Sequence, residues 1–201
     1  MSFWAKRRIC FAALEARELI AHPVSQNWIV IGIGNEYASD DAAGLLVARK
    51  LKDRAPGTVA VVEHGGEGAG LRECWKNAVG VILIDATSSG ASAGTIFRFD
   101  EAAAPLPAER FYRSTHAFGL TEAIELSRSL HELPARLVVY GIEGRDFSAG
   151  IGLTAEVAAA VEAVAERVLQ EVKSGDAARG GQSEHAENNP PRDRSPGPQP
   201  A

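Results

Sequence analysis

Four side chains could take part in metal or acid–base chemistry, and each lies where a predicted strand ends or a loop opens. Asp40 and Asp41 stand side by side after the first apolar run. Asp85 ends a later apolar run, and His116 precedes a predicted helix. Hard carboxylate oxygens and a borderline imidazole nitrogen each accept a first-row divalent ion in the nickel, iron or zinc range. Such groups can hold one ion and leave a position for a substrate group, so the candidate site is Asp41 with Asp40, Asp85 and His116.

Each of these residues also has a purely structural interpretation. An acidic pair at the start of a helix is most often a cap favoured by the helix dipole. Asp85 could bond the backbone amides of a loop, and a single histidine before a helix is more often structural than a ligand. His64, beside Gly65 and Gly66, is a fourth candidate that ranks only slightly below His116. Position in the sequence alone therefore leaves the ligand set open.

The elements that must position these residues alternate between strand and helix. Apolar and β-branched runs predict strands at 28–33, 58–63, 79–84, 95–99 and 137–142. Amphipathic stretches predict helices at 41–54, 69–77, 120–130 and 154–173. The expected N-caps are Ser39 or Asp40, Thr121 and Thr154. This order is typical of a doubly wound α/β sheet, in which right-handed crossovers place the strand ends along one rim.

Length and composition limit the class of protein. The 201 residues, 45% hydrophobic and 23% charged, predict one soluble domain at 28–173, preceded by a helical or disordered extension at 1–27 and followed by a disordered tail at 174–201. A net charge of −5 argues against nucleic acid as a partner. No apolar run reaches the roughly 18 to 20 residues of a membrane span. The start is too short in apolar residues for a signal peptide, and Cys10 and Cys74 form no metal or redox motif, so we expect a cytoplasmic protein.

A nucleotide-binding or other small-molecule-binding α/β protein is the alternative reading of the first loop. Gly32 and Gly34 follow a predicted strand and precede a helix, as a phosphate-binding loop does. Tyr37 replaces the third glycine of that motif, however, and the acidic pair would face the phosphates. A serine hydrolase is less favoured, since no G-x-S-x-G motif is present.

Blocks in this order and spacing resemble those of the hydrogenase maturation endopeptidases, which trim the large subunit of nickel-iron hydrogenases. The resemblance covers about residues 28 to 172. The matching blocks are Gly32-Ile33-Gly34-Asn35, Asp40-Asp41-Ala42-Ala43-Gly44, Ile84-Asp85-Ala86, Gly94-Thr95, Ser114-Thr115-His116-Ala117-Phe118-Gly119-Leu120, Gly141-Ile142-Glu143 and Gly152-Leu153-Thr154. Taken with the strand and helix pattern, it implies a three-layer doubly wound α/β sandwich: a mostly parallel, twisted sheet of about five strands with helices on both faces.

The resemblance also implies a nickel-sensing site of two carboxylates and a histidine, which by motif position are Asp41, Asp85 and His116. The family has Glu or Asp at the first of these places, and it gives His64 no ligand role. Gly144 departs from the pattern, because a proline often follows the Gly-Ile-Glu block. Asp40 is then better assigned to the turn than to the metal.

The function implied is that of an endopeptidase that removes a C-terminal extension from the nickel-loaded large-subunit precursor of a nickel-iron hydrogenase. The precursor itself supplies the nickel, so the expected partner is that precursor, with no nucleic acid and no membrane, and the enzyme is expected to be a monomer. A nickel-dependent chaperone that binds the precursor without cutting it is a further alternative.

Overall fold

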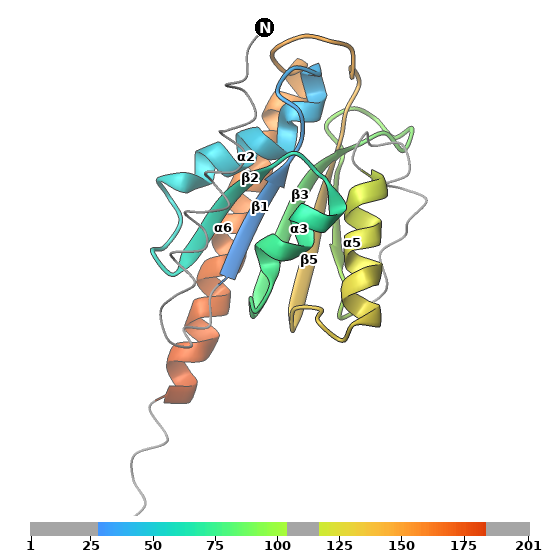
Figure 1. Cartoon of the computed structure of the whole chain (residues 1–201). Helices are drawn as coiled ribbons and strands as arrows, with labels where there is room; N and C mark the ends of the chain where they lie inside the picture. Colours follow the sequence, from blue (N-terminus) through green and yellow to red (C-terminus); the bar gives the residue numbers. More distant parts are fainter. Residues whose placement is uncertain (1–27, 104–116, 184–201) are drawn as a thin grey trace, which may run out of the picture.

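The computed structural model describes residues 28–103 and 117–183, and predictions that fall on 1–27, 104–116 and 184–201 lie outside the described residues. Within the described ranges, one sheet of five strands has the order β2-β1-β3-β5-β4 (Figure 1). The strands are β1 (Trp28–Ile33), β2 (Val59–His64), β3 (Gly80–Thr87), β4 (Ile96–Asp100) and β5 (Arg136–Glu143). The helices are η1 (Ser39–Ala42), α2 (Ala43–Lys52), α3 (Gly68–Trp75), α5 (Ala117–Ser129) and α6 (Ala155–Ser183).

The sheet is mostly parallel. Strand β1 pairs in parallel with β2 and β3, and β3 pairs in parallel with β5, whereas the edge strand β4 runs antiparallel to β5. Helices α2 and α6 cover one face, and α3 and α5 cover the other (Figure 1). The predicted three-layer α/β sandwich is therefore confirmed, and the carboxyl ends of β1, β3 and β5 meet at one edge.

Alternate residues of the central strands feed two separate cores, which explains why those strands are apolar without interruption. In β1, Trp28 and Val30 pack with α2 and α6, while Ile29, Ile31 and Ile33 pack with α3 and α5. Strand β3 divides its side chains in the same way and is buried along its whole length. A polar side chain within such a strand therefore needs hydrogen-bond partners inside the protein.

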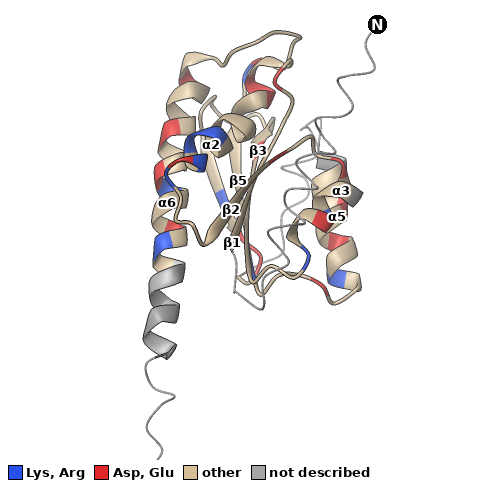
Figure 2. Cartoon of the chain, turned by 60° about the vertical axis from the view of Figure 1, so that its left-hand side comes forward, with Lys and Arg blue, Asp and Glu red and all other residues tan. Residues whose placement is uncertain are grey.

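Helices α2 and α6 lie side by side and carry opposite charges on their outer surfaces (Figure 2). Lys50 pairs with Glu162, and the guanidinium of Arg54 lies 2.5 Å from the carboxylate of Glu166. Exposed pairs of this kind stabilise a fold by at most about 1 kcal/mol each. The apolar contacts beneath them, for example those of Val47 and Val161 in the same core, therefore hold the two helices together.

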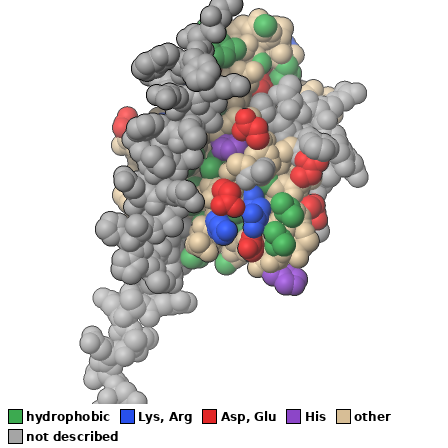
Figure 3. Space-filling model, viewed as in Figure 1, with side chains coloured by type: hydrophobic (Ala, Val, Ile, Leu, Met, Phe, Trp, Pro, Cys, Tyr) green, Lys and Arg blue, Asp and Glu red, His purple; other side chains and the backbone are tan. Residues whose placement is uncertain are grey.

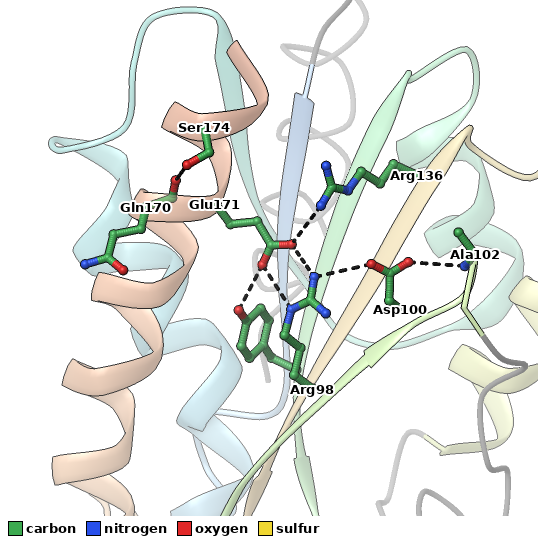
Figure 4. A network of polar contacts seen from close by, with 8 residues as sticks. Arg98, Asp100, Ala102, Arg136, Gln170, Glu171 and Ser174 are labelled. Carbon is green, nitrogen blue, oxygen red and sulfur yellow. Dashed lines mark hydrogen bonds and ion pairs between the residues drawn. The ribbon is translucent and has the colours of Figure 1, made fainter. Parts of the chain in front are cut away.

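Glu171 connects α6 to the antiparallel edge of the sheet (Figure 4). Its carboxylate accepts hydrogen bonds from Nη2 of Arg98 at 2.5 Å and from the hydroxyl of Tyr140 at 2.9 Å. Burial, together with the nearby charge of Glu171, raises the pKa of Tyr140 to about 12. Arg136 adds an ion pair to the same carboxylate at 3.7 Å. The network joins β4 and β5 to α6 away from the carboxyl edge of the sheet.

Helix α2 approaches the sheet so closely that only glycine fits at its start. A Cβ atom on Gly44 would lie 2.3 Å from the carbonyl oxygens of both Ile33 and Ile84. A Cβ atom on Gly32 would lie 2.2 Å from the carbonyl oxygen of Gly44. These contacts place η1 and the start of α2 directly over the carboxyl ends of β1 and β3.

Three predictions about helix ends are wrong. Helix α2 is preceded by the 3-10 turn η1, and no side-chain hydrogen bond caps either element, so neither Ser39 nor Asp40 acts as its cap. Helix α5 begins at Ala117, which places Thr121 inside the helix. Helix α6 continues to Ser183 instead of ending near Lys173. Extending an existing helix needs no new nucleus, so α6 continues through a stretch that holds Gly175, Gly180 and Gly181.

We expect Gly44→Ala to destabilise the fold by about 3 kcal/mol, because the new methyl group would overlap two backbone carbonyls that cannot move independently of the sheet. Gly57→Ala is the matched control, since a Cβ there meets nothing within 4 Å. Urea denaturation of both variants checks this. Equal stability of the two variants would contradict the close approach of α2 to β1 and β3.

Candidate active site

Asp41 and Asp85 lie on neighbouring elements at the carboxyl edge of the sheet. Asp41 belongs to η1, which follows β1 and contacts β3, and Asp85 lies within β3, two residues before its end. Both side chains are fully buried. Because Gly44 touches the backbone of Ile84, the segment that carries Asp41 is held against the strand that carries Asp85. The predicted placement of the two carboxylates along one rim is confirmed.

Asp85 bonds a backbone amide, as its structural interpretation from the sequence suggested, but that amide belongs to β3 and not to a loop. Its Oδ1 accepts a hydrogen bond from the backbone N–H of Ala86 at 2.9 Å. Strand β3 runs on to Thr87, so Asp85 is a member of the strand and pairs in register with Gly141 of β5. The carboxylate is therefore carried by a fixed backbone. It can act as a rigid ligand for a group that binds at the carboxyl edge of the sheet.

His116 lies outside the described residues, so the structure does not test its place beside the carboxylates. The helix that follows it in sequence, α5, begins at the carboxyl edge of the sheet: a Cβ on Gly119 would lie 1.9 Å from the carbonyl oxygen of Gly66, in the loop after β2. Within residues 28–103 and 117–183, no group of three acidic, histidine or cysteine side chains is arranged to hold a metal. The ligand set of Asp41, Asp85 and His116 stays a prediction.

Asp40, the neighbour of Asp41, has a separate structural task. Its buried carboxylate accepts hydrogen bonds from the backbone N–H groups of Arg145 (2.9 Å), Asp146 (3.0 Å) and Thr154 (2.7 Å), and from the Thr154 hydroxyl (3.0 Å). Burial alone would raise the pKa of Asp40, but these bonds together outweigh it and hold the pKa below its usual value. Asp40 thus fixes the loop between β5 and α6, at the start of α6, and not the start of α2.

Glu143 is a second structural carboxylate at this edge, and sequence reasoning did not single it out. It is buried at the end of β5, where its carboxylate accepts hydrogen bonds from the Thr87 hydroxyl (3.0 Å), the backbone N–H (3.0 Å) and hydroxyl (2.9 Å) of Ser89, and the backbone N–H groups of Gly90 (2.7 Å) and Ala91 (3.1 Å). An acidic residue directly after an apolar strand was the available signal, as it was for Asp85. Glu143 therefore fixes the loop that follows β3.

His64 ends β2, on the opposite side of β1 from β3 and Asp85. Its Nδ1 accepts a hydrogen bond from the backbone N–H of Gly66 at 2.9 Å. A Cβ on Gly70 would lie 3.0 Å from its Nε2, so the ring also packs against α3. The histidine therefore helps to shape the turn between β2 and α3.

Comparison with known proteins decides the family. The sequence model of the family described as hydrogenase maturation protease matches residues 45–171. The chain belongs to the hydrogenase maturation protease family. It is also 30% identical over 145 residues to the hydrogenase 2 maturation protease of Escherichia coli, which covers 70% of this chain and 87% of that protein.

Solved structures of this family have the same fold. The hydrogenase maturating endopeptidase HybD from Escherichia coli matches with a TM-score of 0.67 and 28% identity, over 74% of this chain and 93% of that one. HybD from Thermococcus kodakarensis matches with a TM-score of 0.59 and 28% identity, over 71% of this chain and 96% of that one. The chain is therefore a protease, a hydrolase of the maturation endopeptidase type, and membership of this family displaces the nucleotide-binding alternative.

The family match includes Asp85 and His116 and begins four residues after Asp41. Within the part of the chain that the structure describes, no helix combines the length and apolar character that crossing a membrane requires. The described portion of this maturation protease is a single α/β unit. Its buried acidic residues lie at the carboxyl edge of the sheet: Asp40, Asp41, Asp85 and Glu143.

We expect Asp40→Asn to destabilise the protease by about 3 kcal/mol at pH 7, because the amide cannot accept all the N–H donors that meet the carboxylate. The folded pKa of Asp40 is depressed, so its contribution is complete above the ordinary pKa of about 4 and is lost as the pH falls through the lowered value. The difference between wild type and variant should shrink in acid.

Urea denaturation at pH 7 and at pH 3 measures this difference. Asp53→Asn, which changes an exposed carboxylate at the end of α2, is the control and should leave stability unchanged at both values. A difference between wild type and Asp40→Asn that stays constant with pH would contradict the role of the charged carboxylate.

Proposed function

We propose that this protease removes the C-terminal extension of a nickel-iron hydrogenase large-subunit precursor, and that nickel held by the precursor is its recognition element. The observation that carries the proposal is the pair of carboxylates, Asp41 and Asp85, held together at the carboxyl edge in a member of a hydrogenase maturation protease family. His116 would be the third group to contact the metal. In open α/β sheets this edge is where ligands bind.

The chemistry of the proposed ligands is compatible with nickel. Two carboxylates and an imidazole suit a borderline divalent ion, which accepts oxygen and nitrogen ligands together. Asp41 and Asp85 are carried by backbone that Gly44 and the strand pairing hold still, so they would meet the ion without being reordered first. Nickel is part of the substrate in this proposal, and the protease brings only the ligands.

Recognition through nickel would make processing wait for metal insertion. A metal contacted by both proteins stabilises their complex. The nickel-free precursor lacks this contact and therefore binds the protease more weakly. The contact thereby sets the order of assembly: nickel first, removal of the extension second. Each cut consumes one water and releases the extension as a peptide.

Burial of the carboxylates sets a condition on binding. Asp41 and Asp85 have no exposed surface in the described structure. A precursor can contact them only if the surface that covers them opens when it binds.

The proposal also places the reaction in the cytoplasm, with the protease acting as a monomer.

The first test compares nickel-loaded and nickel-free precursor as substrates. We expect the protease to release the C-terminal peptide from the loaded form alone, because nickel supplies the contact that the free form lacks. Mass spectrometry of the large subunit reports the loss. Equal cleavage of both forms would contradict nickel recognition, and binding to the loaded form without any cleavage would instead support a nickel-dependent chaperone.

The second test removes the proposed ligands one at a time. Asp41→Asn, Asp85→Asn and His116→Ala should each slow processing by at least about a hundredfold, as losing a group at the reacting centre commonly does. Asp41→Glu should retain activity, because it keeps the carboxylate. Asp53→Asn is the control on an exposed carboxylate.

The initial rate of peptide release measures these effects, and circular dichroism checks that each variant is folded. Full activity of any one of the three ligand variants would remove that residue from the site. Loss of activity in Asp53→Asn would show that the assay responds to changes outside the site.

A further inference from the structure

Two large hydrophobic side chains stand out into solvent at the carboxyl edge, and the site described above gives them no task. Tyr37, in the loop after β1, is 64% exposed, and Ile151, in the loop between β5 and α6, is 85% exposed. We call these two residues the rim patch. Figure 3 shows exposed hydrophobic side chains at the upper end of the molecule, where Figure 1 places η1 and the loop before α6, and also lower on the same face.

The backbone joins the two loops that carry the rim patch, although Tyr37 and Ile151 are 114 residues apart in sequence. Ala38 and Gly150 form a parallel β-bridge. In it, the N–H of Gly150 donates to the carbonyl of Tyr37 at 2.9 Å, and the N–H of Ser39 donates to the carbonyl of Gly150 at 3.2 Å. The two loops therefore form one structural unit at this point.

Side chains strengthen the same unit. The hydroxyl of Ser39 donates to the carbonyl of Ser148 at 3.0 Å. The carboxylate of Asp40 holds the loop at Arg145 on one side of Ile151 and at Thr154 on the other. The rim patch is thus presented on ordered backbone, so a partner that buries it would pay little to order these loops.

Burying two such side chains favours binding by their apolar area alone. Removing a large apolar side chain from water favours association, and tyrosine is among the residues that most often dominate protein interfaces. Small molecules, in contrast, prefer concave sites that enclose most of their surface. Side chains that are 64% and 85% exposed suit contact with the surface of a protein partner.

We propose that the rim patch is the docking surface for apolar side chains of the protein substrate, next to the segment that delivers the scissile bond. This proposal rests on the proposed function, because the occupant is the same hydrogenase large-subunit precursor. The continuity of the patch with the site supports that occupant: Tyr37 lies four residues before Asp41 in the turn that carries it, and Asp40 joins this turn to the loop of Ile151.

The rim patch contributes affinity for the precursor and takes no part in peptide-bond cleavage. Tyr37 and Ile151 stand in solvent, whereas the proposed nickel ligands Asp41 and Asp85 are buried. Its removal should therefore raise KM for the precursor with little change in kcat.

The test uses Tyr37→Ser, Ile151→Ser and the double variant, with the nickel-loaded precursor as substrate. We expect KM to rise at least tenfold for each single variant and at least fiftyfold for the double variant, with kcat within twofold of wild type. Leu126→Ser and Leu130→Ser are the matched controls. These leucines are 47% and 50% exposed, on and just after α5, and should leave both constants unchanged.

Three results would overturn the proposal: an unchanged KM in the double variant, an equal rise in KM for the leucine controls, or loss of wild-type self-association in the double variant, which would make the patch a contact between copies of this chain. Sedimentation velocity supplies the last measurement. A wild-type protease that binds the loaded precursor and does not cut it would overturn the proposed function. The dissociation constants of the same variants would then decide the docking surface separately.

Discussion

The carboxyl edge of this protease depends on one buried carboxylate, that of Asp40. It accepts N–H groups from both ends of the loop between β5 and α6, and its own N–H donates to the carbonyl of Asp146 at 2.9 Å. A charge buried this deeply is tolerable only because donors surround it. Through these bonds the turn after β1 and the start of α6 form one rigid rim, on which both Asp41 and the rim patch are mounted.

Acidic residues at this edge have divided roles, although they look alike in sequence. Asp40 and Glu143 each hold a loop in place, because their carboxylate oxygens accept hydrogen bonds from backbone N–H groups and hydroxyls of that loop. Asp41 and Asp85 are set on adjacent elements, η1 and β3, in the position proposed for contact with nickel. The structural carboxylates thus hold still the frame within which the proposed ligands act.

Local sequence patterns predicted the strands and the layered fold, because burial on both faces of a parallel sheet demands continuous apolar runs such as 80–84. They also predicted that Asp41 and Asp85 share one rim. Local patterns could not predict that Asp40 bonds the loop between β5 and α6, because its partners lie 105 to 114 residues away in sequence. They could not predict the bonds of Glu143 either, since the loop it holds is more than 50 residues away. The extent of α6 was underestimated because composition says little about how far a helix continues. The place of His116 stays a prediction.

The contact between this protease and the precursor's nickel is the central claim, and X-ray absorption spectroscopy at the nickel edge tests it most directly. Spectra of the nickel-loaded precursor alone, frozen with wild-type protease before cleavage, and frozen with Asp41→Asn or Asp85→Asn would be compared. The account predicts new oxygen and nitrogen neighbours of nickel in the wild-type complex, and fewer of them in each variant. A nickel spectrum that is the same with and without the protease, in a complex shown to have formed, would contradict it.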